Sequence, residues 1–251
     1  MSTAAMTERT TEVSPLLKAR VAGVFYLLVF LTGGGALFLS GRLVVNGDAA
    51  ATAANILAHE PSFRLGFAAN LIATACYIVV TALFYDLFKP VNRSLSLIAA
   101  FTSLVGCAIG GLSSLFQLAP LAVLEGGQYL SVFTVQQLQA LALLFLKLGG
   151  QANAIGLIFF GFYCLLIGYL ILRSTFLPRI LGALMAFGGL GWLTFLSPPL
   201  ATYLSPYVLA PGILGEGSLT LWLLVMGVNV QRWNEQASAA GGWQSKRAMH
   251  A

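Results

Sequence analysis

The 251-residue chain is 58% hydrophobic and only 8% charged, whereas about 25% of the residues of an average soluble domain are charged. So few charges cannot cover a water-soluble protein of this size, which excludes a soluble globular domain. The formal net charge is +5, and the basic residues stand beside apolar stretches. The excess therefore indicates membrane insertion and contact with anionic lipid, and it does not indicate nucleic-acid binding.

Six apolar stretches are long enough to cross a bilayer, which requires about 20 residues of helix. The predicted spans are residues 19–39, 65–87, 95–118, 151–172, 179–197 and 212–231. The first is longer than the apolar part of a signal peptide and no A-x-A-like cleavage site follows it, so we interpret it as a retained helix. Residues 1–14 and 234–251 are short and polar, and we expect disordered tails flanking one transmembrane domain over residues 15–233.

Two connecting segments have helical patterns of their own. Asp48 precedes the Ala-rich stretch 49–60 and is a typical helix N-cap, and Pro61 follows this stretch. Leucines recur at helical spacing through residues 134–148, which are too few to span a bilayer and are followed by two glycines. We therefore predict an all-α polytopic membrane protein with six transmembrane helices and two short amphipathic helices on the outside.

The basic residues divide unequally between the two sides of the membrane. With the N-terminus inside, only Arg42, Arg64 and Lys147 of the 13 Lys and Arg residues lie outside. This is the positive-inside pattern. We expect a multi-pass protein of the inner (plasma) membrane with both termini in the cytoplasm.

The chain has few of the residues that catalysis, metals or cofactors require. Its two histidines, His59 and His250, lie in an outside loop and in the C-terminal tail, and its three cysteines form no C-x-x-C pair. No lysine lies within a predicted span, and the glycine clusters stand in apolar helices, not after a strand. We therefore expect no catalytic residue, no metal, no cofactor and no enzymatic activity.

Polar residues recur at helical spacing on the second and third spans. The two stripes are Asn70, Thr74, Tyr77 and Thr81, and Ser103, Gly106, Gly110, Ser113 and Gln117. Two such stripes that face each other form either a hydrogen-bonded seam or a narrow polar path.

Glu216 is the most informative single residue, because it lies about one turn into the last span, between Gly215 and Gly217. A carboxylate within the membrane is costly, so it normally faces the bundle interior and has a partner. By expected depth, Lys147 and four other polar residues are candidate neighbours. We predict an outward-facing polar cavity lined by Arg64, Asn70, Gln117, Asn153 and Glu216.

Different functions fit this pattern. In the first, the cavity binds or passes a small solute, an ion or a lipid head group, with Glu216 as a proton or cation site. In the second, Glu216 pairs with Arg64, the polar groups only hold the bundle together, and the protein acts through partners. The G-x-x-x-G at Gly106 and Gly110 then joins helices of one subunit or of a homo-oligomer. An intramembrane lipid-modifying enzyme is the third and least supported, because no nucleophile–base pair is visible.

Several segments carry a family resemblance. They include GRLVVNGDAAATAANILA (41–58), LFKPVNRSLSLIAAF (87–101), LQALALLFLKL (138–148) and GEGSLTLWLLVMGV (215–228). Together with similar segments between them, they resemble the bacterial membrane family called domain of unknown function 4386 over nearly all of residues 17–230. The resemblance implies a six-helix bundle with amphipathic segments outside, and it implies no activity, ligand or cofactor. Its motif positions include Arg64, Asn70, Arg173, Pro178, Arg179, Glu216 and Trp222.

Overall fold

The computed structural model describes residues 14–205 and 207–248, and these residues form helices and no strand. Six helices are long and apolar enough to cross a membrane, which confirms the predicted all-α membrane fold. The four longest are α1 (Pro15–Gly41), α3 (Glu60–Phe88), α4 (Arg93–Leu124) and α5 (Val135–Arg173). The other two are α6 (Arg179–Leu193), which continues into the 3-10 helix η2 (Thr194–Leu196), and α8 (Ala210–Val225), which follows η3 (Tyr207–Leu209).

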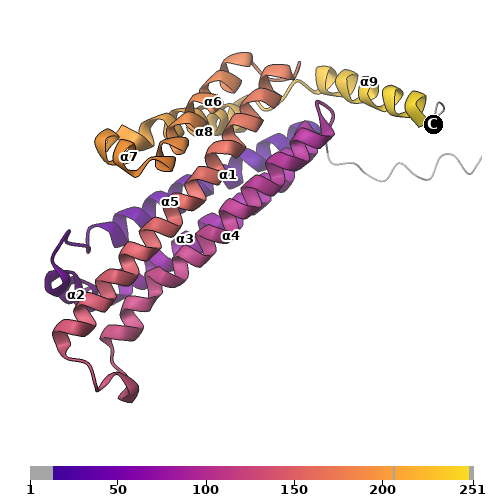
Figure 1. Cartoon of the computed structure of the whole chain (residues 1–251). Coiled ribbons are helices and arrows are strands. Elements are labelled where there is room, and N and C mark those ends of the chain that lie inside the picture. The colour runs from indigo at the N-terminus through magenta and orange to yellow at the C-terminus, as the bar shows by residue number, and fades with distance from the viewer. Residues whose placement is uncertain (1–13, 206, 249–251) are drawn as a thin grey trace, which may run out of the picture.

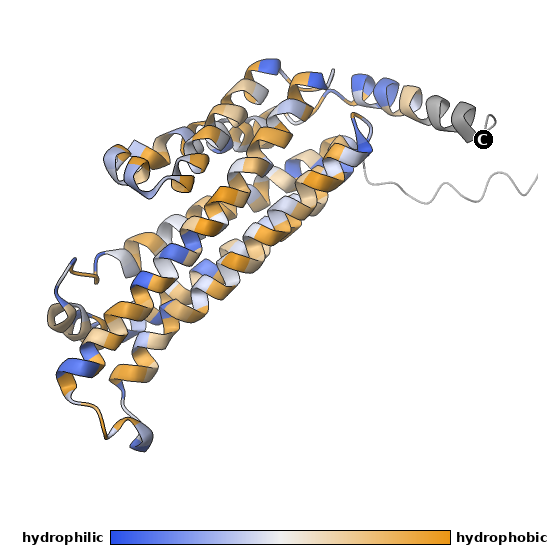
Figure 2. Ribbon diagram, viewed as in Figure 1, coloured by the Kyte–Doolittle hydropathy of each residue, from blue (hydrophilic) through white to orange (hydrophobic). Residues whose placement is uncertain are grey.

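The short elements connect these spans at the ends of the bundle. They are α2 (Ala49–Ala58), η1 (Gln128–Leu130), α7 (Pro198–Leu204) and α9 (Val230–Ala248). We call the end that carries the start of α1, the α3–α4 and α5–α6 turns and the end of α8 the basic end. Figure 2 shows hydrophobic residues along most of the length of the spans and hydrophilic residues gathered near their ends and on α9.

The six spans form a closed ring in which α1, α3, α4, α5, α6 and α8 each pack against the next, and α8 packs against α1. α6 has 15 residues and α8 has 16, whereas α5 has 39. These two short helices therefore flank only the half of the bundle next to the basic end, and the four long helices extend beyond them (Figure 1).

Glycines allow α6 to fit between its neighbours. A Cβ at Gly182 would lie 2.7 Å from the carbonyl oxygen of Gly168 on α5, and a Cβ at Gly215 would lie 2.5 Å from the carbonyl oxygen of Leu184 on α6. The Gly106 position of the G-x-x-x-G motif lies against Phe160 of α5, so this motif packs α4 against α5 within one chain.

The first predicted amphipathic helix is present as α2, and Asp48 Oδ1 accepts a hydrogen bond from the backbone N–H of Ala51 (2.8 Å). Its buried face contacts α4 and α5. Ile56 of α2 joins a small core with Leu43, Phe63 and Leu121 at the end opposite the basic end.

The second predicted amphipathic helix is corrected by the structure, because residues 135–148 are the first part of α5 and not a separate helix. Thr134 and Gln137 form a capping box that starts the helix. The helix continues through the two glycines because Gly149 packs closely against α4, and its carbonyl accepts a hydrogen bond from Ser113 Oγ (2.8 Å).

In the structure residues 234–248 continue α9, whereas the sequence predicted a disordered tail over residues 234–251. Trp233 Nε1 donates to the carbonyl of Leu87 (2.9 Å), and Gln236 Oε1 accepts from the backbone N–H of Thr175 (3.1 Å). These bonds attach the start of α9 to the basic end. Residues 1–13 of the predicted N-terminal tail and residues 249–251 lie outside the described residues.

Candidate functional site

Glu216 lies in the interior of the ring, and its side chain accepts hydrogen bonds from aromatic residues. The indole Nε1 of Trp192 donates to Oε1 (2.7 Å), and the hydroxyls of Tyr26 and Tyr77 donate to Oε2 (2.5 and 3.0 Å). We call Tyr26, Tyr77, Trp192 and Glu216 the Glu216 cluster.

The cluster joins most of the ring at one level. Tyr26 is on α1, Tyr77 on α3 and Trp192 on α6, so Glu216 of α8 contacts side chains of three other spans. The glycine before Glu216 allows α8 to approach α6 closely, and the Trp192 ring lies over Gly212 one turn away. The hydroxyls of Tyr26 and Tyr77 are themselves 3.2 Å apart.

No cation pairs with Glu216 within residues 14–205 and 207–240, where every ion pair involves Asp86, Glu60 or Glu125. Glu216 is nevertheless only 7% exposed. Along α3, its neighbour Tyr77 lies nine residues from Asp86 and thirteen from Arg64, which is about 14 and 20 Å at the rise of an α-helix. The carboxyl group therefore lies well away from both charged ends of α3.

The alternative in which Glu216 pairs with Arg64 does not agree with the structure. Arg64 is exposed near the opposite end, where Nε lies 2.6 Å from Glu60 Oε1 and Nη2 lies 2.7 Å from Glu125 Oε1. Glu60 stands one helical turn before Arg64, so the two side chains are neighbours on the surface of α3. Pairing at an exposed position also avoids the desolvation penalty of a buried ion pair.

The remaining predicted cavity residues lie at separate places. Asn70 Nδ2 donates to Ser114 Oγ (2.8 Å), and Gln117 Nε2 donates to Ser40 Oγ (2.9 Å). Asn153 is exposed on α5. Across the described residues, none of these amides hydrogen-bonds to Glu216, so the structure does not gather the five predicted residues around the carboxyl group.

The two predicted polar stripes share one hydrogen-bonded pair, since the Oγ atoms of Thr81 and Ser103 are 2.6 Å apart. Asn70 bonds to Ser114, which the predicted stripe on α4 did not include, and Ser113 and Gln117 bond to α5 and α1. The predicted stripe on α3 included Tyr77, but no sequence pattern indicated Tyr26 or Trp192 as partners of Glu216. The sequence carried only a general indication for them, because any buried Tyr or Trp needs a hydrogen-bond partner for its polar atom.

The apolar spans and their ring arrangement define a multi-pass membrane protein. The chain belongs to the family described as Domain of unknown function (DUF4386), which matches residues 21–227 and confirms the resemblance seen in the sequence. No curated protein and no solved structure matches the chain. The family assigns no activity, so the function has to be inferred from the site.

Proposed function

We propose that this is a non-enzymatic membrane protein in which Glu216 binds and releases a proton while the protein binds or passes a small solute or ion. The observation that supports this proposal is a buried carboxyl group within the membrane-spanning helices with three hydrogen-bond donors and no paired cation among the described residues. An ionisable residue at such a depth is expensive, and it commonly marks a proton or ion pathway.

The chemistry of the neighbours favours a proton over a metal cation. A hard cation requires several oxygen ligands, whereas the indole N–H of Trp192 is a donor only and already occupies Oε1. The two tyrosine hydroxyls are shared with Oε2. A proton needs only one oxygen of the carboxyl group, so it fits without displacing the Trp192 bond.

Protonation would change the hydrogen bonds of the cluster unequally. An ionised carboxylate only accepts, but a protonated carboxyl also donates from one oxygen. A tyrosine hydroxyl can rotate and accept that hydrogen, whereas an indole N–H cannot. The bonds to Tyr26 of α1 and Tyr77 of α3 would therefore rearrange while the bond to Trp192 of α6 persists. In this way the charge of Glu216 would affect the packing of α8 against α1 and α3.

The orientation is part of the proposal. Positive-inside asymmetry favours both termini in the cytoplasm and insertion in the inner membrane. The Arg64 end would then face outward, and the solute or ion would approach Glu216 from that side.

A structural role is the second candidate, because the same three hydrogen bonds connect α8 with α1, α3 and α6. Buried polar groups often join helices within membranes. In that case an isosteric amide would serve as well as the carboxyl group, and the protein would act through partners.

Charge movement after a pH step separates the two candidates. Proteoliposomes of the full chain on a solid-supported membrane are exposed to a rapid pH step, and the transient current is recorded. Under the proposal, wild type gives a current that Glu216→Gln abolishes. The control Glu125→Gln, which removes an exposed carboxylate at the opposite end, keeps that current. Equal currents from wild type and Glu216→Gln would refute the proposal and favour the structural role.

A further inference from the structure

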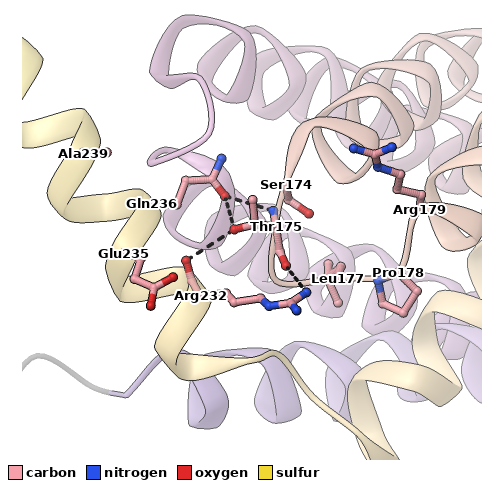
Figure 3. Close-up of a pocket in the computed structure, with 9 residues that line it drawn as sticks. All are labelled: Ser174, Thr175, Leu177, Pro178, Arg179, Arg232, Glu235, Gln236 and Ala239. Carbon is pink, nitrogen blue, oxygen red and sulfur yellow. Dashed lines mark hydrogen bonds between the residues drawn. The ribbon is translucent and has the colours of Figure 1, made fainter.

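A pocket at the basic end is independent of the Glu216 cluster. It has a volume of about 720 Å³ and lies between the turn that joins α5 to α6 and the start of α9. Figure 3 shows its side chains, among which Arg179 comes from the first residue of α6 and Arg232 from α9. The lining residues are Ser174, Thr175, Leu177, Pro178, Arg179, Arg232, Glu235, Gln236 and Ala239.

The walls of the pocket are held together by hydrogen bonds. Thr175 donates to Gln236 Oε1 from its backbone N–H (3.1 Å) and from Oγ1 (3.2 Å). The backbone N–H of Asn229 donates to the carbonyl of Phe176 (3.2 Å). The loop and α9 are thus attached to each other beside the pocket, as the dashed lines between Thr175 and Gln236 in Figure 3 indicate.

The two arginines of the pocket have no carboxylate partner in the described part of the chain, where the ion pairs lie elsewhere. Among the described residues, the Arg232 guanidinium donates one long hydrogen bond, to the carbonyl of Thr175 (3.4 Å). Glu235 also lines the pocket, and it accepts a hydrogen bond from Gln231 (3.1 Å). The guanidinium groups can therefore take an anionic ligand, and Glu235 would oppose it.

A second pocket adjoins the first, and most of its lining residues are apolar. Its volume is about 400 Å³, and Thr175, Leu177, Pro178 and Arg232 line both pockets. Trp222 and Met226 at the end of α8 line only the second pocket. Met226 is 59% exposed, and neighbouring Val225 is 69% exposed. A basic pocket next to the apolar side chains of Trp222 and Met226 matches a molecule with an anionic head and a hydrocarbon chain.

The position of the pockets agrees with such a ligand. Arg179 begins a candidate membrane span, and Val225 ends another. This level corresponds to the polar head groups at the edge of the hydrocarbon core. Guanidinium groups bind phosphate through charge-assisted, frequently bidentate hydrogen bonds. Basic pockets between transmembrane helices are also known to bind anionic lipid head groups.

We infer that these adjoining pockets bind one anionic phospholipid, with its phosphate on Arg179 and Arg232 and its first hydrocarbon segment on Trp222 and Met226. The lipid would connect the α5–α6 turn with α8 and α9. This site does not depend on the proposed function of Glu216.

Thermal unfolding of the purified full chain in neutral detergent tests the inference. Phosphatidylglycerol is titrated in, with phosphatidylcholine and inorganic phosphate as separate arms. The expected result is a rise in Tm with phosphatidylglycerol that neither other arm reproduces. In the double variant Arg179→Gln/Arg232→Gln, the phosphatidylglycerol concentration that gives half of the maximal Tm shift should rise about 30-fold. Each basic residue contributes about 1 kcal/mol of binding free energy, which is about fivefold in affinity at about 1.4 kcal/mol per tenfold.

Two matched variants make the test specific. Arg20→Gln/Arg93→Gln removes two exposed arginines from the same end, and Arg93 begins α4 as Arg179 begins α6. This control should bind phosphatidylglycerol as wild type does. Glu235→Gln should bind it more tightly, by about fivefold, because a repulsive charge is removed.

Three results would overturn the inference. If the control variant binds phosphatidylglycerol as weakly as the pocket variant does, the lipid is attracted by the general surface charge. If the pocket variant binds as tightly as wild type does, its two arginines do not bind the phosphate. A Tm rise with inorganic phosphate that equals and blocks the lipid effect would show a site for free anions. If the double pocket variant does not fold, the single variants Arg179→Gln and Glu235→Gln still decide the test. Arg179→Gln must bind phosphatidylglycerol more weakly than wild type, and Glu235→Gln must bind it more tightly.

Discussion

Replacement of Glu216 by Ala and by Gln should have very different effects on stability. Ala removes the acceptor of three buried donors, on Tyr26, Tyr77 and Trp192. Side-chain hydrogen bonds in membrane proteins contribute about 0.6 to 1 kcal/mol each, so the loss approaches 2 to 3 kcal/mol. The two tyrosine hydroxyls lie 3.2 Å apart and can recover one bond with each other. We expect a decrease of about 2 kcal/mol in the free energy of unfolding, besides the effect of the cavity.

Gln keeps the shape and most of the hydrogen bonds. Its amide oxygen can accept from Trp192, and its amide nitrogen can donate to the tyrosine oxygens once their hydroxyls rotate. The amide also avoids the desolvation of a charge. We therefore expect Glu216→Gln to lie within about 1 kcal/mol of wild type or to be more stable.

Equilibrium unfolding in mixed micelles measures both variants under one condition. Glu125→Ala and Glu125→Gln serve as controls, because Glu125 is half-exposed and pairs with Arg64 at the far end of the bundle. These two should differ from each other by less than about 0.5 kcal/mol. If Glu216→Ala and Glu216→Gln also differ by less than about 0.5 kcal/mol, the role of Glu216 as the acceptor of three donors is refuted.

Further predictions concern packing, charge and orientation. Gly182→Ala should destabilise the protein by about 1 to 3 kcal/mol in the same unfolding assay, because its Cβ would lie 2.7 Å from a carbonyl oxygen of α5; Gly150→Ala, whose Cβ meets no atom within 4 Å, should not. Asp86→Asn removes ion pairs with two lysines, at 2.9 and 2.8 Å. The free energy of unfolding should fall by up to about 1 kcal/mol per pair at low salt and by less in 1 M salt. A decrease of the same size at both salt concentrations would contradict this. An impermeant maleimide should label Glu125→Cys in intact cells and Ser238→Cys only after permeabilisation, since the three native cysteines are buried and positive-inside asymmetry sets the orientation; the reverse pattern would contradict the topology.

The spans were predictable because a bilayer imposes a minimum apolar length on any helix that crosses it. The N-cap of α2 was equally accessible, since Asp48 and the backbone it caps are neighbours in sequence. The sequence predicted a helix end at residues 149 and 150 because glycine has a low helix propensity. The close contact of Gly149 with α4 depends on tertiary packing, and this packing keeps α5 continuous.

The interior position of Glu216 followed from the cost of a membrane carboxylate, but its partners could not be read from the sequence. Tyr26, Tyr77 and Trp192 lie 190, 139 and 24 residues away along the chain. Their convergence depends on the order of helices in the ring and on the rotation of each helix about its axis. The expected depth alone made Arg64 a candidate partner of Glu216. Helical spacing, however, places Glu60 next to Arg64 on the same helix, and the two residues form an ion pair.

The most direct test of Glu216 as a proton site is infrared difference spectroscopy of the full chain in lipid, recorded between two pH values. Wild type should show the band of a protonated carboxyl group that grows as the pH falls and shifts on exchange into D2O. Glu216→Gln should lack this band, and Glu125→Gln should retain it. Identical carboxyl difference spectra for wild type and Glu216→Gln would show that Glu216 does not exchange a proton, and would contradict the proposed function.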